Sequence, residues 1–235
     1  MSGSEPALIV FCREPIPHQS KTRLIGRLTP VDAARLADAF IVDAVAKAVA
    51  VGARQVVIAA SAPDGADNSK YFRRIARRFD ATIVDQRNGS LGARMARVLE
   101  PFASSGALLI GTDTPSLPLP LLAKSLHALG KSRIVIAPSL DGGYYAVGVR
   151  GAMPPIFTAI RWGTGNVLEA TIRRLKNAGI RYALGPAWYD VDRWSDVMLL
   201  AAHLRLRRAE HRTSASPCPA TEAVLKRLGL LRDAR

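Results

Sequence analysis

The chain is poor in acidic, aromatic and cysteine residues, and long apolar runs are absent. Its 235 residues include 19 Asp and Glu against 33 Lys and Arg, and aromatic side chains make up 6%. The two cysteines, Cys12 and Cys218, have neither metal-binding nor redox spacing, which excludes a disulfide scaffold and a zinc finger. No apolar run is long enough to cross a bilayer. The stretch before residue 7 lacks the basic region and cleavage site of a signal peptide, so we expect a cytoplasmic protein with reduced thiols.

The shortage of acidic residues leaves a formal net charge of +14, which raises the hypothesis of a nucleic-acid partner. The basic residues are spread over several expected helices, however, and no helix-turn-helix, zinc-finger or RNA-binding signature occurs. Solvated helix faces explain such a distribution, and a positive field that attracts a phosphorylated substrate is the alternative. We therefore expect no nucleic-acid partner.

Hydrophobic residues make up 49% of the chain, and they alternate between two kinds of segment. Near-continuous runs of Val, Ile, Leu and Ala predict strands buried on both faces at residues 7–12, 55–61, 81–85, 107–111, 133–138 and 144–149. Helical periodicity predicts helices at residues 30–51, 71–78, 91–103, 119–129, 166–178 and 195–209. The alternation of strand and helix predicts an open, mostly parallel, doubly wound α/β sheet.

The domain organisation follows from the same pattern. Residues 1–210 are expected to form a single domain. Residues 212–221 (RTSASPCPAT) read as a linker, followed by a short helix near residues 222–228 that packs on the domain.

Two familiar nucleotide-binding patterns are absent. Ser20-Lys21-Thr22 resembles the end of a P-loop, but Ser20 and Pro15 stand where that loop needs glycines. No G-x-G-x-x-G pattern follows any expected strand. Any nucleotide site must therefore be built differently.

Ligands of open α/β sheets bind at the carboxyl ends of the strands, and basic or glycine-rich loops follow two of the expected strands. The loop after the first strand carries Arg13, Lys21 and Arg23, cations suited to a di- or triphosphate. After the third strand, Gly89 and Gly92 permit close approach of a base or ribose, although an Asn-Gly turn with Ser90 capping the next helix is the alternative.

Acidic residues stand in three further segments, two after expected strands and one near the end of the chain. Asp113 stands after the fourth strand, where a carboxylate can hold a hard divalent cation. Asp190 and Asp192 are two residues apart, so on an extended chain they face the same side, although a helix-capping cluster would have the same composition. Between the fifth and sixth strands, Asp141-Gly142-Gly143 indicates either close ligand contact or a tight hairpin turn.

Taken in order, these segments resemble a known family. It is DUF2064, also described as a glycosyltransferase-like group associated with radical-SAM and selenodomain proteins. Its patterns F-A-R-x-P-x-P-G-x-x-K-T-R-L, L-G-x-R-M, G-[ST]-D-[ST]-P-x-L-P, D-G-G-Y-Y, W-[SG]-T and D-V-D-x-x-x-D match residues 11–24, 91–95, 111–118, 141–145, 162–164 and 190–196. The resemblance extends over about residues 7–210. His18 and Arg193 are departures, standing where the family has Gly and Thr.

The resemblance implies a three-layer α/β/α GT-A-like fold of the nucleotide-diphospho-sugar transferases. It also implies a divalent metal ion, Mg²⁺ or Mn²⁺, held by Asp113, Asp190 and Asp192, and catalytic roles for Lys21, Arg23 and Asp113. By position, the nucleotide would contact Arg13, Lys21, Arg23, Gly89, Leu91, Gly92 and Arg94. The acceptor or transferred group would lie near Asp141, Gly142, Gly143, Tyr144, Trp162 and Thr164.

The expected activity is metal-dependent transfer from a nucleotide donor to an unknown small-molecule acceptor. The first hypothesis is glycosyl transfer from a nucleotide-diphospho-sugar. The alternative is nucleotidyl transfer that joins a nucleoside triphosphate to a small acid, as in the guanylyltransferases that this chain resembles. A nucleotide-binding module without turnover is the third. The sequence leaves the oligomeric state open, and a homodimer is compatible with it.

Overall fold

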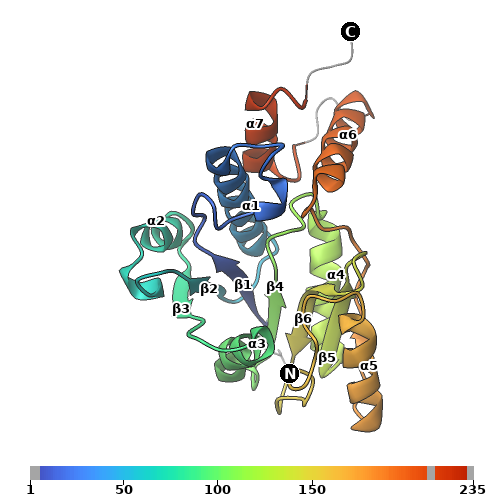
Figure 1. Cartoon of the computed structure of the whole chain (residues 1–235). Helices are drawn as coiled ribbons and strands as arrows, with labels where there is room; N and C mark the ends of the chain where they lie inside the picture. Colours follow the sequence, from blue (N-terminus) through green and yellow to red (C-terminus); the bar gives the residue numbers. More distant parts are fainter. Residues whose placement is uncertain (1–5, 211–214, 232–235) are drawn as a thin grey trace.

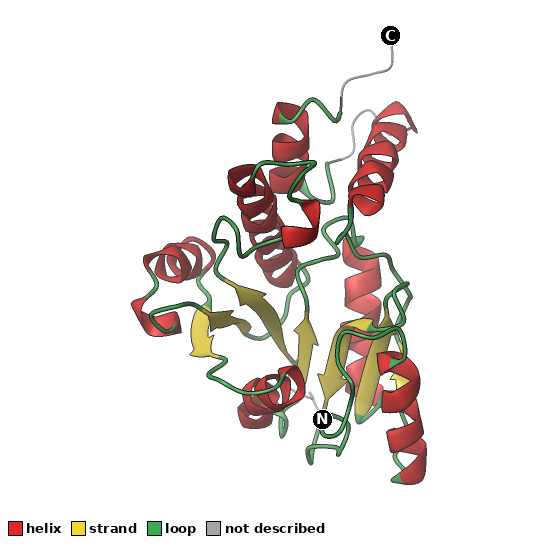
Figure 2. Ribbon diagram, in the orientation of Figure 1, coloured by secondary structure: helices red, strands yellow, loops and turns green. Residues whose placement is uncertain are grey.

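The computed structural model describes residues 6–210 and 215–231, and a central sheet organises them (Figures 1 and 2). Among these residues the sheet has seven strands in the order β3-β2-β1-β4-β6-β5-β7. Only β6 runs opposite to the others, because it pairs antiparallel with both β4 and β5. The strands are β1 (Ala7–Arg13), β2 (Val56–Ser61), β3 (Thr82–Asp85), β4 (Ala107–Ile110), β5 (Ile134–Pro138), β6 (Tyr144–Val149) and β7 (Ala183–Leu184).

Helices cover both faces of the sheet and give the predicted three layers (Figure 1). One apolar core joins the sheet to α1, α2 and α4, and a second core joins the opposite face to α3 and α5. The helices are α1 (Pro30–Ala50), α2 (Lys70–Phe79), α3 (Leu91–Leu99), α4 (Leu119–Lys131), α5 (Val167–Asn177), α6 (Trp194–Glu210) and α7 (Pro219–Arg227). No helix within the described ranges is long and apolar enough to span a membrane.

Most of the predicted elements are confirmed, with small shifts at their ends. Thr29 caps α1 by accepting a hydrogen bond from the backbone N–H of Asp32, and Pro30 begins the helix. The expected helix over residues 91–103 is divided, because α3 ends at Leu99 and a 3₁₀ turn, Glu100–Phe102, follows it. Strand β7 was not predicted, since two residues at a sheet edge are too short to show a pattern.

The segment after α6 differs from the expected linker. Helix α7 begins at Pro219, inside the predicted linker, while residues 211–214 lie outside the described residues. The buried carboxylate of Asp43 on α1 accepts the backbone N–H groups of Ala220 and Thr221, which satisfies free donors at the start of α7. A third apolar cluster joins α1, α6 and α7 beside the sheet layers (Figure 1).

The strand order creates a natural ligand position. The chain runs outward from β1 through β2 to β3, and then returns to place β4 on the other side of β1. Two loops therefore diverge at the carboxyl ends of β1 and β4. Open α/β sheets bind their ligands at such a switch point.

Candidate functional site

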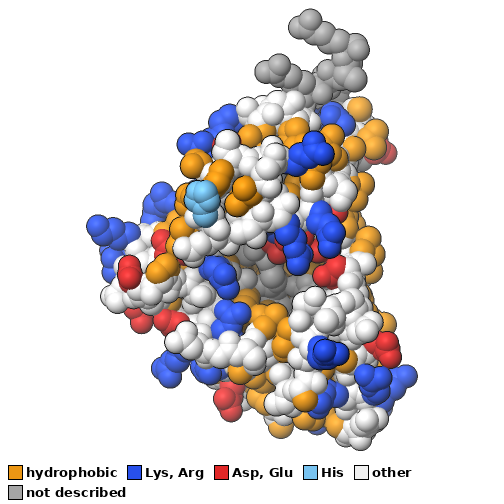
Figure 3. Space-filling model, in the orientation of Figure 1, with side chains coloured by type: hydrophobic (Ala, Val, Ile, Leu, Met, Phe, Trp, Pro, Cys, Tyr) orange, Lys and Arg blue, Asp and Glu red, His pale blue; other side chains and the backbone are white. Residues whose placement is uncertain are grey.

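A cavity of about 280 Å³ lies at this switch point between β1 and β4. Figure 3 shows a hollow in the face of the molecule, with basic and acidic side chains gathered around it. Its lining includes charged or polar side chains from four separate segments: Arg13, Lys21, Gln86, Arg94, Asp113 and Asp192. The strand-end rule therefore located the cavity correctly.

The ammonium group of Lys21 connects the segments on one side of the cavity. Its Nζ lies 2.6 Å from Asp113 Oδ1, 2.7 Å from the carbonyl oxygen of Val191 and 3.4 Å from Asp192 Oδ1. The Lys21 side chain is 7% exposed, against 48% for Asp113 and 33% for Asp192. The ammonium also lies 5.1 Å from the centre of the Phe40 ring. Residues predicted to bind phosphate and metal thus contact one another directly.

The carboxylate of Asp192 is held from two further directions. Arg23 donates a hydrogen bond to Asp192 Oδ2, and this ion pair lies near the surface. The backbone N–H groups of Asp192 and Arg193 donate to Asp196 Oδ2, at 3.0 and 2.7 Å. Asp196 therefore caps the start of α6 and orients the segment that carries Asp192. Capping, the alternative considered for this segment, accounts for Asp196 but not for Asp192.

A backbone hydrogen bond joins the loop after β4 to the late acidic segment. The Val191 N–H donates to the carbonyl oxygen of Asp113 at 2.7 Å, and the Val191 side chain is fully buried. Lys47 donates to the carbonyl oxygen of Pro115 in the same loop. Asp113 and Asp192 are therefore brought together by backbone contacts as well as by Lys21.

Asp190 lies in the same acidic region. Burial raises the pKa of its carboxyl group, and the nearby carboxylates of Asp141, Asp113 and Asp192 raise it further. Within residues 6–210 and 215–231, no three His, Cys, Asp or Glu side chains form a group able to hold a metal ion. Asp113 and Asp192 are the carboxylates that share a cation position, and Lys21 occupies it.

The loop after β1 contains two backbone conformations that favour glycine. His18 has φ 66° and Lys21 has φ 48°, both in the left-handed region. His18 stands where the family pattern has Gly, so the structure explains that glycine as a conformational requirement. The buried hydroxyl of Ser20 accepts the Ile16 N–H at 2.9 Å, which closes the turn and fixes the start of the Lys21 segment.

Gln86 is a residue that the sequence reasoning missed. It follows β3, its side chain is buried, and its amide nitrogen donates to the carbonyl oxygens of Cys12 and Ala59 at 2.9 and 2.8 Å. Its amide oxygen accepts from Arg94 Nη1 at 2.8 Å. Gln86 thereby fixes the Arg94 guanidinium, which also lies over the Phe11 ring with 5.6 Å to its centre. The sequence offers only its position directly after an expected strand, because its burial is visible in the structure alone.

Arg94 and Arg13 lie close together in the cavity. Burial lowers the pKa of the Arg94 guanidinium, and the positive charge of Arg13 lowers it further. Arg94 Nε is buried and has no hydrogen-bond partner among the described residues. Among residues 6–210 and 215–231, no carboxylate forms an ion pair with Arg13 or Arg94. This end of the cavity therefore carries uncompensated positive charge, suited to an anionic group.

Gly92, predicted to lie near a base, has a clear packing role. A Cβ atom at this position would lie 2.0 Å from the carbonyl oxygen of Phe157 and 2.9 Å from the Trp162 ring. Ser90 caps α3 by accepting the Ala93 N–H, which confirms the turn-and-cap alternative for this segment. Contact of Gly89, Leu91 and Gly92 with a base stays a prediction.

The residues predicted to meet the acceptor gather at the β5–β6 turn. Asp141 Oδ1 accepts from the Gly143 N–H at 2.8 Å and from the Ser139 hydroxyl. Gly142 has φ 85°, and a Cβ there would lie 1.9 Å from the carbonyl oxygen of Gly165. The hairpin-turn alternative is therefore confirmed, and only glycine fits at position 142.

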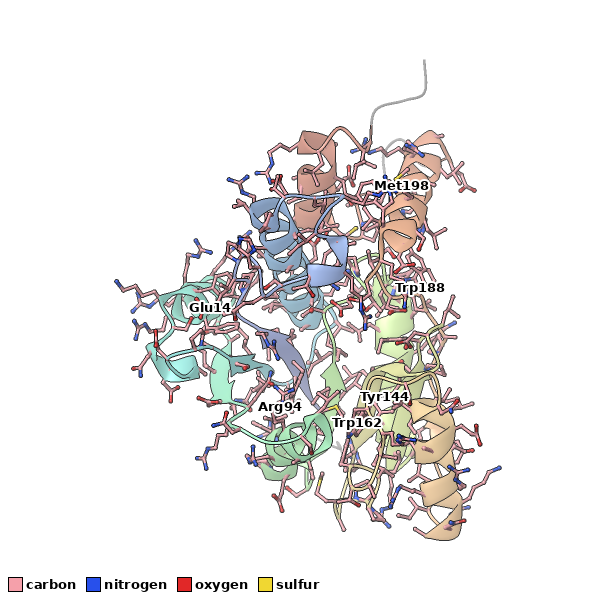
Figure 4. The ribbon with its side chains drawn as sticks, in the orientation of Figure 1. Glu14, Arg94, Tyr144, Trp162, Trp188 and Met198 are labelled. Atoms are coloured by element: carbon pink, nitrogen blue, oxygen red, sulfur yellow. The ribbon has the colours of Figure 1, made fainter. Side chains whose placement is uncertain are left out.

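The aromatic residues of this region pack against each other beside the turn. The rings of Tyr144 and Trp162 meet edge to face with centres 6.3 Å apart (Figure 4). The Thr164 hydroxyl donates to the carbonyl oxygen of Arg161. Asp141, through its effect on Asp190, is the member of this group that lies near the acidic region.

We predict that Gly92→Ala destabilises the protein, because the new methyl group meets backbone that cannot move freely. The expected loss is about 1–3 kcal/mol in the free energy of unfolding, measured by urea denaturation. Gly130→Ala is the matched control: it is also in a helix and has no atom within 4 Å of its Cβ position. That change should be neutral or stabilise by up to about 1 kcal/mol. Equal effects of the two substitutions would contradict the packing role of Gly92.

We also predict that Gln86→Met costs about 1–3 kcal/mol of stability, because the carbonyl oxygens of Cys12 and Ala59 lose a buried donor. The control is Gln55→Met at an exposed position, where the amide donates to the Thr82 hydroxyl at 3.1 Å. That variant should stay within about 0.5 kcal/mol of the parent protein. A similarly small change in Gln86→Met would argue against its anchoring role.

Comparison with solved structures relates this fold to nucleotide-using transferases. A crystal structure from Desulfovibrio desulfuricans G20, provisionally described as a nucleotide-diphospho-sugar transferase, has a TM-score of 0.79, 26% identity and 97% coverage of both chains. CMP:2-keto-3-deoxy-manno-octonic acid synthetase with CTP has a TM-score of 0.56 at 14% identity, covering 86% of this chain and 99% of the other. Glucosyl-3-phosphoglycerate synthase from Mycobacterium tuberculosis, in complex with Mn²⁺, UDP and glucosyl-3-phosphoglycerate, has a TM-score of 0.53 at 10% identity, covering 86% and 80%.

The last two similarities concern the fold alone, and together the three identify it as GT-A-like, as predicted. No curated protein matches the sequence. The sequence model of a family described as an uncharacterized protein conserved in bacteria (DUF2064) matches residues 42–164, which is more than half of the chain. The chain therefore belongs to the DUF2064 family.

Proposed function

We propose that this protein is a metal-dependent transferase that uses a nucleotide donor, and specifically a glycosyltransferase-like enzyme acting on a nucleotide-diphospho-sugar. The observation that carries the proposal is the cavity at the switch point, which combines uncompensated arginines at one end with clustered carboxylates at the other. A diphosphate bound beside a divalent cation requires both kinds of group. The likeness of the whole fold to nucleotide-using transferases supports the same class.

In this proposal the donor phosphates bind the cations of the cavity. Neither Arg13 nor Arg94 forms an ion pair among the described residues, so both can donate to phosphate, and Gln86 holds Arg94 in place for that contact. Lys21 and Arg23, also expected to bind phosphate, form ion pairs with Asp113 and Asp192. The guanidinium groups of Arg13 and Arg94 would stabilise the departing diphosphate.

A divalent cation is compatible with the residues present. The carboxylates of Asp113 and Asp192 converge on one cation position, and Mg²⁺ in proteins is commonly held by one or two carboxylates together with phosphate oxygens and water. The role of Asp190 as a third ligand stays a prediction, because Asp113, Asp190 and Asp192 do not form a three-residue metal-binding group among the described residues. When bound, the metal ion would neutralise charge on the phosphates. The acceptor would approach from the β5–β6 turn, next to Asp141.

The test is a thermal-denaturation panel of nucleoside triphosphates and nucleotide-diphospho-sugars, each with Mg²⁺ or Mn²⁺. A ligand that binds the folded state raises the midpoint by mass action. We expect nucleotide-sugars to give the larger shift. A shift with triphosphates alone would instead favour nucleotidyl transfer, and no shift with any nucleotide would contradict the proposal.

Arg94→Gln should weaken binding of the stabilising nucleotide about tenfold or more, because a charge-assisted hydrogen bond to phosphate is lost. Isothermal titration calorimetry measures this change. Arg74→Gln, on the exposed face of α2, removes the same charge away from the cavity and should leave the dissociation constant unchanged. Equal nucleotide affinities in the two variants would show that Arg94 does not contribute to nucleotide binding.

A further inference from the structure

The Lys21 ammonium group has no hydrogen-bond donor left for a ligand. An ammonium carries three N–H donors, and three oxygens surround this one: Asp113 Oδ1, the Val191 carbonyl and Asp192 Oδ1. Its side chain is 7% exposed. Lys21 therefore occupies a cation position formed by oxygens, and in this arrangement it cannot donate to a phosphate.

The charges in direct contact around Lys21 balance each other. Lys21 and Arg23 contribute two positive charges, and they contact the two carboxylates of Asp113 and Asp192. A divalent ion that approached these carboxylates would meet the ammonium at contact distance, and repulsion at such a distance is large when little water intervenes. Binding of the ion at this position thus requires the ammonium to move away.

We propose that Lys21 is an internal cation that holds Asp113 and Asp192 together in the ligand-free protein and leaves that position when a divalent metal ion binds. The inference rests on the proposed function, because the same two carboxylates are the proposed metal ligands. It adds that only one cation, the metal ion or the Lys21 ammonium, can lie between Asp113 and Asp192 at a time. The displaced ammonium becomes available to the donor phosphates.

The side chain of Lys21 is suited to such a movement. It has a flexible four-carbon stem, so rotation about its side-chain bonds can move the charge while the backbone stays in place. The backbone is anchored independently, through the hydrogen bond between the Ser20 hydroxyl and the Ile16 N–H. The cavity borders Lys21 and also contains Arg13 and Arg94, whose charges would draw an anionic ligand to the position that the displaced ammonium reaches.

The exchange predicts that metal and nucleotide assist each other's binding. The metal ion displaces the Lys21 ammonium group, and a phosphate of the nucleotide then stabilises the displaced ammonium. Conversely, a bound phosphate attracts the ammonium away from the two carboxylates, which removes the charge that opposes metal binding. By linkage, each ligand must raise the affinity of the other by the same factor. Without Lys21, this part of the coupling disappears and the metal ion binds the bare carboxylate pair.

The decisive experiment measures Mn²⁺ binding to the full chain without nucleotide, by the loss of the free-ion signal in electron paramagnetic resonance. We expect Lys21→Gln to bind Mn²⁺ about tenfold more tightly than the parent protein. Arg27→Gln, an exposed change on the same loop, is the control for loss of positive charge and should change the affinity little. Circular dichroism verifies that each variant is folded.

A second measurement uses the parent protein without any substitution, and so does not depend on the folding of Lys21→Gln. Acylation of lysines, read by mass spectrometry, should label Lys21 slowly in the absence of metal because its amine is buried and hydrogen-bonded. Saturating Mg²⁺ should raise labelling of Lys21 by about fivefold or more. Labelling of Lys124, exposed on α4, should not change.

The outcomes separate this inference from the proposed function. Equal Mn²⁺ affinity in the parent protein and Lys21→Gln, with Lys21 labelling unaffected by Mg²⁺, overturns the exchange but leaves a metal-dependent transferase intact. If neither protein binds Mn²⁺ while nucleotides still bind, the exchange is overturned. Lys21 would then stay between Asp113 and Asp192 and have a structural role alone. Failure of every nucleotide to bind contradicts the proposed function, and the metal-only result still decides the inference.

Discussion

One ammonium group, that of Lys21, holds together three segments that are far apart in the sequence. It connects the loop after β1 to the end of β4 and to the segment before α6. Without this cation, Asp113 would lose its ion-pair partner and Asp192 would keep only Arg23, and like charges at short distance destabilise a fold. The ion cluster therefore determines both the geometry of the candidate site and the conditions under which another cation can enter it.

The opposite end of the cavity obeys a different constraint. There the guanidinium of Arg94 is fixed by the buried amide of Gln86 and by the Phe11 ring, while Arg13 adds a second positive charge. Figure 4 shows Arg94 to the left of Trp162 and Tyr144. A ligand with negative charge would relieve this repulsion. The two ends together make the cavity electrically asymmetric, which is the physical basis for proposing that a phosphate-bearing donor binds there.

Much of the fold could be predicted from the sequence, because strands buried on both faces read as continuous apolar runs and helices as periodic ones. The rule that ligands bind at strand ends also selected Lys21 and Asp113 without structural information. The pairing of Lys21 with two carboxylates could not be predicted, since it depends on how loops 92 and 171 residues distant meet in three dimensions. Gln86 was missed because a glutamine after a strand is unremarkable until its burial is known. His18 shows the reverse case, where a departure from a pattern became intelligible only through its φ of 66°.

The central claim is that Lys21 and Asp113 act as one electrostatic unit in the folded protein. A double-mutant cycle tests it most directly, with Lys21→Met, Asp113→Asn and the combined variant compared by their free energies of unfolding in urea. The account predicts that the two changes are coupled by about 1 kcal/mol or more, because either one alone leaves a charge without its partner. Additive effects of the two substitutions would contradict it, and would show that the contact contributes nothing to the assembly of the site.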